Sequence, residues 1–395
     1  MTVANRVGYI VKRGYSTQRT PIDISSNSAF KESLASNALL NRLYQLNQNG
    51  KIAIKVYSDK CPETNLNVSA TLPVTHIPTT KITDAVKQDD SISNWRKPLV
   101  KWFRLGKFVL GMYKVGVKST WSTYFDSKGF KYTVNELTKL IEFKEIESRV
   151  LKQNKFDEID LTRKQYLQWL RRKEFWKIPR FLIAFIMFEE VTPLLCYIFP
   201  SLSPWNCLMP GLYRRISDSR SKKLVDNFEI EKSYISPYEL DKTAVSQFLT
   251  KQNIMPSWRM GIYNITKEFK IPLLKVVETN QKIMIDDWLL LRELLRDSEE
   301  PTILSDRELV DAIARRQLYQ KGEDLNKMVE NIEQQKVLKL RLLLYLSFKF
   351  EGTVAADIFG GKLLAERWGV NNMAIFNFPG SNELLKAEHL KNIGL

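Results

Sequence analysis

The chain has 395 residues, with 60 Lys and Arg against 44 Asp and Glu, giving a formal net charge of +16 at pH 7. This length suits more than one folded unit, and such a basic excess indicates anionic partners such as RNA-rich particles or lipid headgroups. The three cysteines and two histidines have no metal-ligand spacing, so we expect no metal and no cofactor. The sequence has neither a nucleophile elbow nor a phosphate loop, so we expect no enzymatic activity and assign no catalytic residue.

The N-terminal segment has the composition of a mitochondrial transit peptide. The first 22 residues contain Arg6, Lys12, Arg13 and Arg19 but no acidic residue, and apolar residues recur between them at helical spacing. The sequence around Arg13 resembles a matrix-protease site and predicts cleavage after Tyr15, so that residues 1–15 are removed. An ordinary basic amphipathic helix is the alternative interpretation.

The next region predicts one helix and a linker. Residues 29–48 carry leucines at helical spacing, and Asn49-Gly50 ends the pattern. Residues 51–57 predict a strand or an extended segment. Residues 58–93 are rich in Thr, Pro, Asp and Ser without periodicity, which indicates a partly disordered linker. We therefore expect residues 16–93 to form an N-terminal helix and a flexible linker.

Residues 94–177 predict basic helices that lead up to an apolar segment. Between Arg96 and Lys118 there is no acidic residue, and aromatic residues alternate with the charges. Such a helix suits an anionic membrane or a nucleic-acid surface, although a solvated helix packed on a core fits equally well. Residues 132–153 predict a second helix, and Thr162 is expected to cap a third over 163–177. The candidate binding residues here are Arg96, Lys97, Lys101, Arg104 and Lys107.

Residues 178–200, IPRFLIAFIMFEEVTPLLCYIFP, are long enough to cross a bilayer. One helix over this range would span about 35 Å against a hydrocarbon core of about 30 Å. Glu189 and Glu190 lie near its middle, so at least one is expected to be neutral, paired or turned toward a polar interior. Pro193 removes the backbone donor that would bond the Glu189 carbonyl and predicts a kink. A buried amphipathic helix of a soluble protein is the alternative.

The remainder of the chain predicts a helical, soluble region. Helices are expected over 258–269, 271–295, 306–319 and 323–346, with a capping box from Ser305 to Glu308. Asp286 and Asp287 point to different sides of their helix, which favours capping or salt bridges over a cation site. Because both flanks of the apolar segment are positive, charge does not orient it in a membrane. The second basic cluster comprises Arg214, Arg215, Arg220, Lys222 and Lys223.

Taken together, these motifs resemble the LETM family. The run from Leu161 to Pro204 combines a basic helix, a mid-span Glu four residues before a Pro, and a Phe-Pro pair, and residues 285–288 with 304–316 resemble the family's Asp-Asp motif and helical hairpin. Arg180 follows Pro179 where Phe is expected, and counting from that end would place the family's Glu at Glu190. We align it with Glu189, because Pro193, Phe199 and Pro200 keep register with that residue. The calcium-binding loop and the long C-terminal coiled coil are both missing, so the resemblance is to a short member.

The resemblance implies an all-α fold with one transmembrane helix at 178–200, a LETM-type ribosome-binding-like domain at 201–335 on the matrix side, and a helical extension at 336–395. The implied function is an anchor in the mitochondrial inner membrane that binds the mitochondrial ribosome and supports respiratory-chain biogenesis and cation homeostasis. The implied partners are the ribosome, anionic inner-membrane lipids and a second copy of the chain. One alternative is an oligomeric potassium/proton exchanger that uses Glu189, Glu190 and Pro193, and another is a membrane-tethered scaffold.

Overall fold

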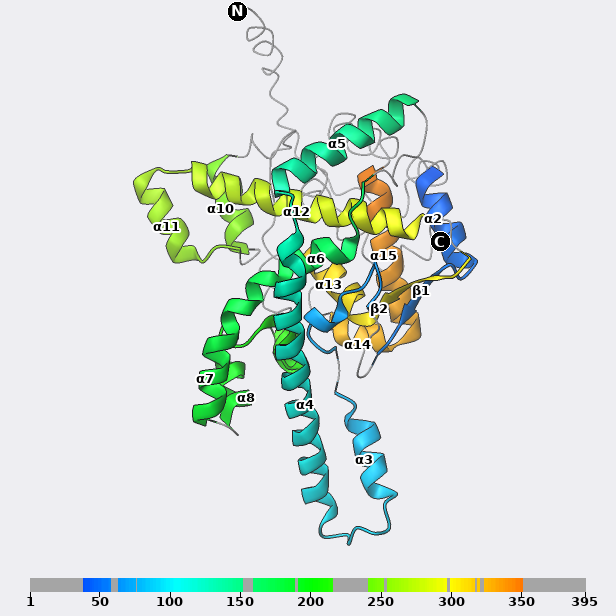
Figure 1. Ribbon diagram of the computed structural model, residues 1–395, viewed down its shortest axis with the longest axis vertical. Coiled ribbons are helices and arrows are strands. Elements are labelled where there is room, and N and C mark those ends of the chain that lie inside the picture. Colours follow the sequence, from blue (N-terminus) through cyan, green and yellow to red (C-terminus); the bar gives the residue numbers. More distant parts are fainter. Residues whose placement is uncertain are drawn as a thin grey trace, which may run out of the picture.

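The computed structural model describes residues 38–57, 63–75, 77–151, 159–188, 191–215, 241–251, 254–296, 299–316, 318–319 and 323–350. Helices dominate these residues (Figure 1). Two long helices, α4 (Lys97–Asp126) and α12 (Lys270–Leu294), run in different directions and organise the shorter elements around them. The other α-helices are α2 (Ala38–Gln48), α3 (Thr79–Lys87), α5 (Val134–Leu151), α6 (Arg163–Arg171), α7 (Ile178–Phe188), α8 (Thr192–Ile198), α10 (Lys242–Lys251), α11 (Ser257–Thr266), α13 (Asp306–Arg316), α14 (Leu325–Glu330) and α15 (Ile332–Phe350).

The all-α prediction holds for most of the described chain, but it omits a small sheet. Strand β1 (Ile52–Lys55) pairs in parallel with β2 (Thr302–Ser305), with Ile52 opposite Thr302. The first strand lies within the range where the sequence predicts a strand or an extended segment. The second was not predicted, because its sequence TILS places two apolar residues side by side and shows no period-two alternation.

The main core lies where α12 passes between α5, α6, α13 and α15. Trp288 is 1 % exposed at its centre, and the sheet and α2 pack on one side. From residue 284 to 294 every side chain of α12 is buried, polar ones included. A helix surrounded on all sides in this way can place charged groups inside the protein only if they are paired.

Buried ion pairs connect α6, α12 and α13. Arg163 Nε lies 2.8 Å from Asp286 Oδ1, and Arg316 Nη2 lies 2.8 Å from Asp286 Oδ2. Arg316 also pairs with Asp287, whose other oxygen accepts a hydrogen bond from Tyr345 Oη at 3.0 Å. The salt-bridging role expected for both aspartates is therefore confirmed. Burial opposes ionisation of Asp286, but the two guanidinium groups outweigh it and lower its pKa.

Part of the predicted flexible linker belongs to the core, which corrects that expectation for residues 64–75. Asn67 is 2 % exposed: its amide nitrogen donates to the carbonyl of Ile303 at 2.7 Å, and its Oδ1 accepts from the backbone N–H of Ser305 at 3.0 Å. The N–H of Val68 donates to Glu308 Oε1 at 2.8 Å. These polar residues look like a loop in sequence, yet they are buried because they satisfy the end of β2 and the start of α13.

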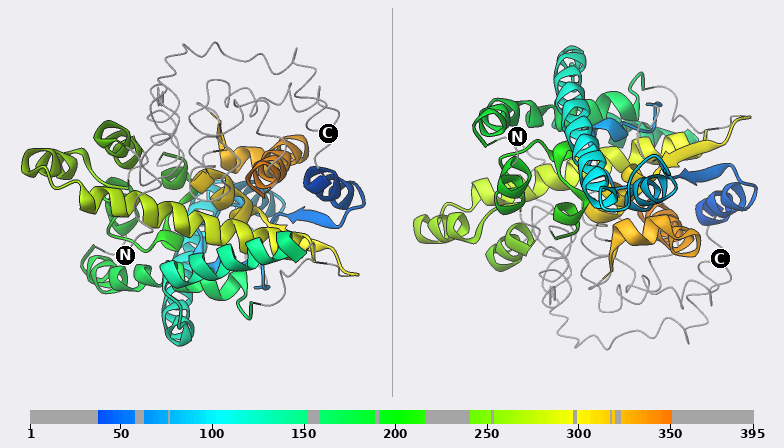
Figure 2. Two further views of the ribbon diagram at one scale, coloured as in Figure 1. Left: turned by 90° about the horizontal axis from the view of Figure 1, so that it is seen from above. Right: turned by 90° about the horizontal axis from the view of Figure 1, so that it is seen from below.

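A second cluster of buried apolar residues joins α10, α11 and the first turns of α12. This lobe lies at one end of α12, away from the sheet and α2 (Figures 1 and 2). Helix α10 was not predicted from sequence. Helix α11 lies within the predicted range apart from its first residue, Ser257, and is followed by Lys267, which has a positive φ of 58°.

Candidate membrane-binding surface

The apolar segment at 178–200 forms two short helices in place of one long helix. Helix α7 ends at Phe188, and α8 begins at Thr192, whose Oγ1 donates to the carbonyl of Ala184 at 3.3 Å. In a continuous helix these residues would be separated by a rise of about 12 Å. Helices α7 and α8 lie side by side, and we call the pair the α7–α8 hairpin (Figure 1). The continuous span predicted here is therefore not formed.

No helix in the described part of the chain has the length and apolar content needed to cross a bilayer. Glu189 and Glu190, the predicted transport residues, lie outside the described residues. Pro193 occupies the first turn of α8, where a missing N–H costs nothing, because that donor has no partner within the helix. The predicted kink is thus replaced by the start of a new helix.

The inner face of the α7–α8 hairpin packs on the middle of α4. Phe181 is 1 % exposed and meets Tyr113 edge to face, with ring centroids 5.4 Å apart. Cys196 is buried in the same cluster. The chain after the hairpin returns to α4 so closely that a Cβ added to Gly116 would lie 2.6 Å from Cys207 Sγ. The hairpin is therefore fixed at its base by close packing against α4.

The outer face of the same hairpin leaves large apolar side chains in solvent. Ile186 and Met187 are 73 % and 69 % exposed, at the end of α7. A folded domain that is surrounded only by water rarely leaves so many neighbouring apolar side chains uncovered. The other exposed apolar residues of the hairpin are Leu182, Ile183, Phe188, Val191, Leu194, Tyr197, Ile198 and Phe199.

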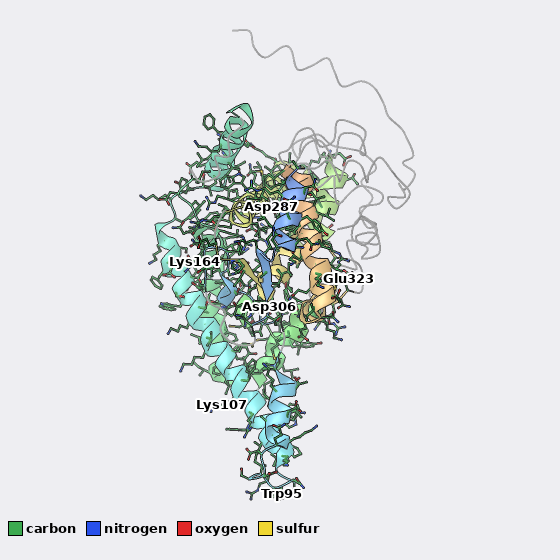
Figure 3. All side chains as sticks on the ribbon, turned by 90° about the vertical axis from the view of Figure 1, so that its right-hand side faces the viewer. Trp95, Lys107, Lys164, Asp287, Asp306 and Glu323 are labelled. Atoms are coloured by element: carbon green, nitrogen blue, oxygen red, sulfur yellow. The ribbon has the colours of Figure 1, made fainter. Side chains whose placement is uncertain are left out.

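Helix α3 and the first half of α4 form an arm that projects from the body, with Trp95 at its far end (Figures 1 and 3). Trp95, Trp102 and Phe103 are 67 %, 71 % and 74 % exposed. Helix α4 has no acidic residue before Asp126. The arm thus combines exposed aromatic rings with an excess of positive charge, as the sequence indicated for α4.

The predicted basic residues of the arm are not equivalent. Lys101 and Lys107 are exposed, and Lys107 lies on the arm below the body (Figure 3). Arg104, by contrast, pairs with Asp89 at 3.1 Å, and the amine of Lys97 donates to the carbonyl of Lys87 at 3.0 Å, so both hold α3 against α4. Arg96 lies over the ring of Trp95, 4.8 Å from its centroid.

The second predicted basic cluster divides between different parts of the structure. Arg214 pairs with Asp324 at 3.2 Å. Arg215 packs on the ring of Tyr197 in α8, 5.0 Å from its centroid, and donates to that residue's carbonyl at 3.3 Å. A positive charge is therefore attached to the α7–α8 hairpin. Arg220, Lys222 and Lys223 lie outside the described residues.

An aromatic cluster that the sequence analysis missed lies between α4 and the turn of 3-10 helix before α7. Tyr124 stacks on Phe175 with centroids 4.1 Å apart, and Trp121 meets the same ring at 5.2 Å. Lys128 lies 4.4 Å from the centroid of Phe125. Trp176, also in the cluster, is 66 % exposed. Aromatic rings with a nearby lysine suit the interface between lipid and water, and their separation in sequence explains why the pattern was missed.

Comparison with known proteins identifies a family other than the one expected. Residues 66–295 match the pentamidine resistance factor domain. The chain is 31 % identical over 358 residues to the mitochondrial pentamidine resistance factor of Saccharomyces cerevisiae, covering 82 % of this chain and 84 % of the relative. No solved structure matches. The relative's mitochondrial location supports the mitochondrial prediction made from residues 1–15, which lie outside the described residues.

The LETM resemblance is therefore wrong, because nothing in the comparisons points to that family. Its motifs were a basic helix, an apolar segment with a Glu-Pro spacing, and an Asp pair. In the structure the basic helix becomes α6 with the turn of 3-10 helix after it, the apolar segment becomes the α7–α8 hairpin, and the Asp pair forms buried ion pairs. These motifs follow from charge and apolar spacing, which unrelated families share. The matched domain covers more than half of the chain, and the yeast relative covers most of it. The chain belongs to the pentamidine resistance factor family.

Proposed function

We propose that this chain is a mitochondrial protein that binds an anionic membrane from one side and acts there as a membrane-tethered scaffold. The observation that carries the proposal is the outer face of the α7–α8 hairpin, where Ile186 and Met187 extend into solvent next to a firmly packed base. Entry of this face into the lipid would leave the backbone of both helices satisfied internally, as a bilayer requires.

The energies favour this role for the hairpin. Removing a large apolar side chain from water is worth about 1.5–3 kcal/mol when it is fully buried. The inner face is already covered by α4, so only the outer face has this energy still to gain. Insertion by a hairpin, unlike a crossing helix, lets the segment return to the side from which it came.

The arm adds electrostatic attraction. Lys101 and Lys107 are exposed, and each lysine near an anionic bilayer contributes about 1 kcal/mol. Trp102 and Phe103 beside them provide rings that favour the headgroup region. Binding is therefore expected to need both anionic lipid and apolar contact, and to weaken but persist at high salt.

Flotation with vesicles tests the proposal on the full chain lacking residues 1–15. Wild-type protein should float with vesicles of phosphatidylcholine and cardiolipin, and an I183D/I186D variant should remain at the bottom. I332D is the matched control, because Ile332 is 71 % exposed at the start of α15, far from the hairpin in sequence. Equal flotation of wild type and the hairpin variant would show that another surface holds the membrane.

Ribosome binding is a second candidate that the same lysines support. Phosphate-rich RNA attracts exposed lysines without regard to sequence, and such binding falls steeply with salt. If the protein sediments with mitochondrial ribosomes but does not float with vesicles, the membrane proposal is wrong and the RNA reading replaces it. Cation exchange through Glu189 stays a prediction, because that residue lies outside the described residues.

The name of the yeast relative connects that protein with resistance to pentamidine. We infer that any such role of this chain is indirect, since pentamidine is a dication and the chain has a formal net charge of +16. Support of membrane function would protect the organelle without contact with the drug. Loss of the gene should raise sensitivity to pentamidine, and the I183D/I186D variant should fail to restore resistance.

A further inference from the structure

Helix α11 carries an apolar face that the hairpin and the arm do not explain. Trp258, Ile262 and Ile265 are 69 %, 49 % and 82 % exposed. At about 100° per residue they project from the helix within a sector of roughly 60°. Met260 projects on the opposite side, 2 % exposed, into the core of the lobe. The helix is therefore apolar both where it packs and where it faces solvent.

The first turns of α12, which follow α11 in the chain, also expose apolar side chains. Ile271 and Leu274 are 53 % and 51 % exposed and lie one turn apart. The core of the lobe is formed by other side chains, among them Val276 and Phe248. We define the lobe face as Trp258, Ile262, Ile265, Ile271 and Leu274.

The charges around the lobe face are mainly positive. Helix α11 contains Arg259 and no acidic residue. Lys267 and Glu268 follow in the turn, and Lys270 begins α12. A protein partner would require a matching acidic helix, whereas an anionic bilayer supplies negative charge along its whole surface. A tryptophan at one end of an apolar stripe with basic flanks is the pattern of a helix that lies in the plane of the interface.

The lobe also lies on the side of the molecule that carries the α7–α8 hairpin. Helix α11 and the α7–α8 hairpin lie on the same side of α4, at the left in Figure 1, and both views of Figure 2 keep them on that side. A position on the same side of α4 (Figure 1) is what contact of both elements with one surface requires.

We propose that the lobe face is a second membrane contact, in which α11 lies flat on an anionic bilayer and fixes the orientation of the molecule that the hairpin anchors. This inference rests on the proposed membrane binding. One contact would leave the body free to rotate about the hairpin. Two contacts at separate points of the fold would set which face of the main core is turned away from the lipid.

Adjacent residues of α11 provide a matched test. I265D and N264D each add one negative charge to exposed positions next to one another, but only residue 265 lies on the lobe face. Dissociation constants for vesicles of phosphatidylcholine and cardiolipin are measured by cosedimentation. I265D should weaken binding about tenfold and N264D less than about twofold, since only the former replaces a lipid-facing apolar group. Circular dichroism checks that both variants are folded.

The outcomes separate the two proposals. If wild type does not bind vesicles, the proposed function fails. If wild type binds and the two variants lose affinity equally, or neither loses any, the lobe face does not contact lipid. A change in oligomeric state by analytical ultracentrifugation in I265D, with vesicle binding intact, would make this face an interface between copies and overturn the inference.

Discussion

Thr192 Oγ1 donates a hydrogen bond to the carbonyl of Ala184 across 3.3 Å, and this contact joins the start of α8 to the middle of α7. The carbonyl accepts it within a helix that ends one turn later, at Phe188. The two ends of the apolar segment therefore lie together at the base of the hairpin. This fold-back decides how the hairpin would enter a bilayer if it binds one as proposed.

If the hairpin inserts as proposed, the described residues before and after it lie on one side of the membrane. Tags placed after residue 15 and after Leu395 should therefore show the same protection from protease in mitoplasts. A single crossing helix would protect one tag and expose the other. Detergent lysis is the control, after which both tags must be digested.

Replacing Asp286 by Asn should destabilise the fold strongly. The substitution leaves Arg163 and Arg316 buried without their shared carboxylate, a defect that costs about 3–5 kcal/mol in the free energy of unfolding. Urea denaturation followed by circular dichroism measures it. Asp90→Asn, at an exposed position, should change the stability by less than about 0.5 kcal/mol. Equal changes in stability in the two variants would contradict a structural role for the ion pairs of Asp286.

Stability should fall on acidification because buried carboxylates have lowered pKa values. Burial raises the pKa of Glu308, but Arg171 and Arg163 outweigh this and hold it below its ordinary value of 4.5; Asp286 is shifted in the same direction. Such groups bind fewer protons folded than unfolded, so their contribution is full above about pH 4.5 and is lost as pH falls through the folded values. Urea midpoints measured between about pH 3 and pH 7 test this, and E308Q should flatten the dependence.

Gly116→Ala should destabilise the base of the hairpin. The new methyl group would lie 2.6 Å from Cys207 Sγ, so α4 or the following turn has to move, at a cost of about 1–3 kcal/mol. Gly106→Ala meets nothing within 4 Å and should stabilise the exposed helix by about 0.5–1 kcal/mol. Thermal melts compare the two. Adding Cys207→Ala to Gly116→Ala should recover part of the loss, and an unchanged loss would place the strain elsewhere.

Local patterns allowed much of the fold to be predicted from the sequence. Thr162 caps α6 as predicted, in a capping box with Gln165, and α12 and α13 begin close to their predicted positions. The box at Ser305 is formed only on one side: its Oγ accepts from the Glu308 N–H at 3.2 Å, while the Glu308 carboxylate bonds Val68 and two arginines. The sequence predicts the hydrogen bond from the Glu308 N–H to Ser305, which is local. The partners of the Glu308 carboxylate come from distant parts of the chain and cannot be predicted in this way.

Long-range contacts could not be predicted. Arg163 and Asp286 are 123 residues apart, and no spacing rule relates them. The hairpin was missed for a different reason. The apolar content of residues 178–200 shows that the segment avoids water but not where it packs. The packing of Phe181 on Tyr113, which places the segment against α4, is a contact between distant residues and cannot be seen in the sequence. The basic residues of the arm were found because charge is visible in sequence, although the pairing of Arg104 with Asp89 was not.

The contact between Gly116 and Cys207 also has a chemical consequence. Cys207 is fully buried, and burial raises the pKa of its thiol to above the range in which it would react as a thiolate. A thiol reagent can modify it only when α4 separates from the turn that follows the hairpin. The rate of alkylation at Cys207 therefore reports how often α4 and this turn separate. If the hairpin binds lipid as proposed, the alkylation rate should fall when vesicles are added.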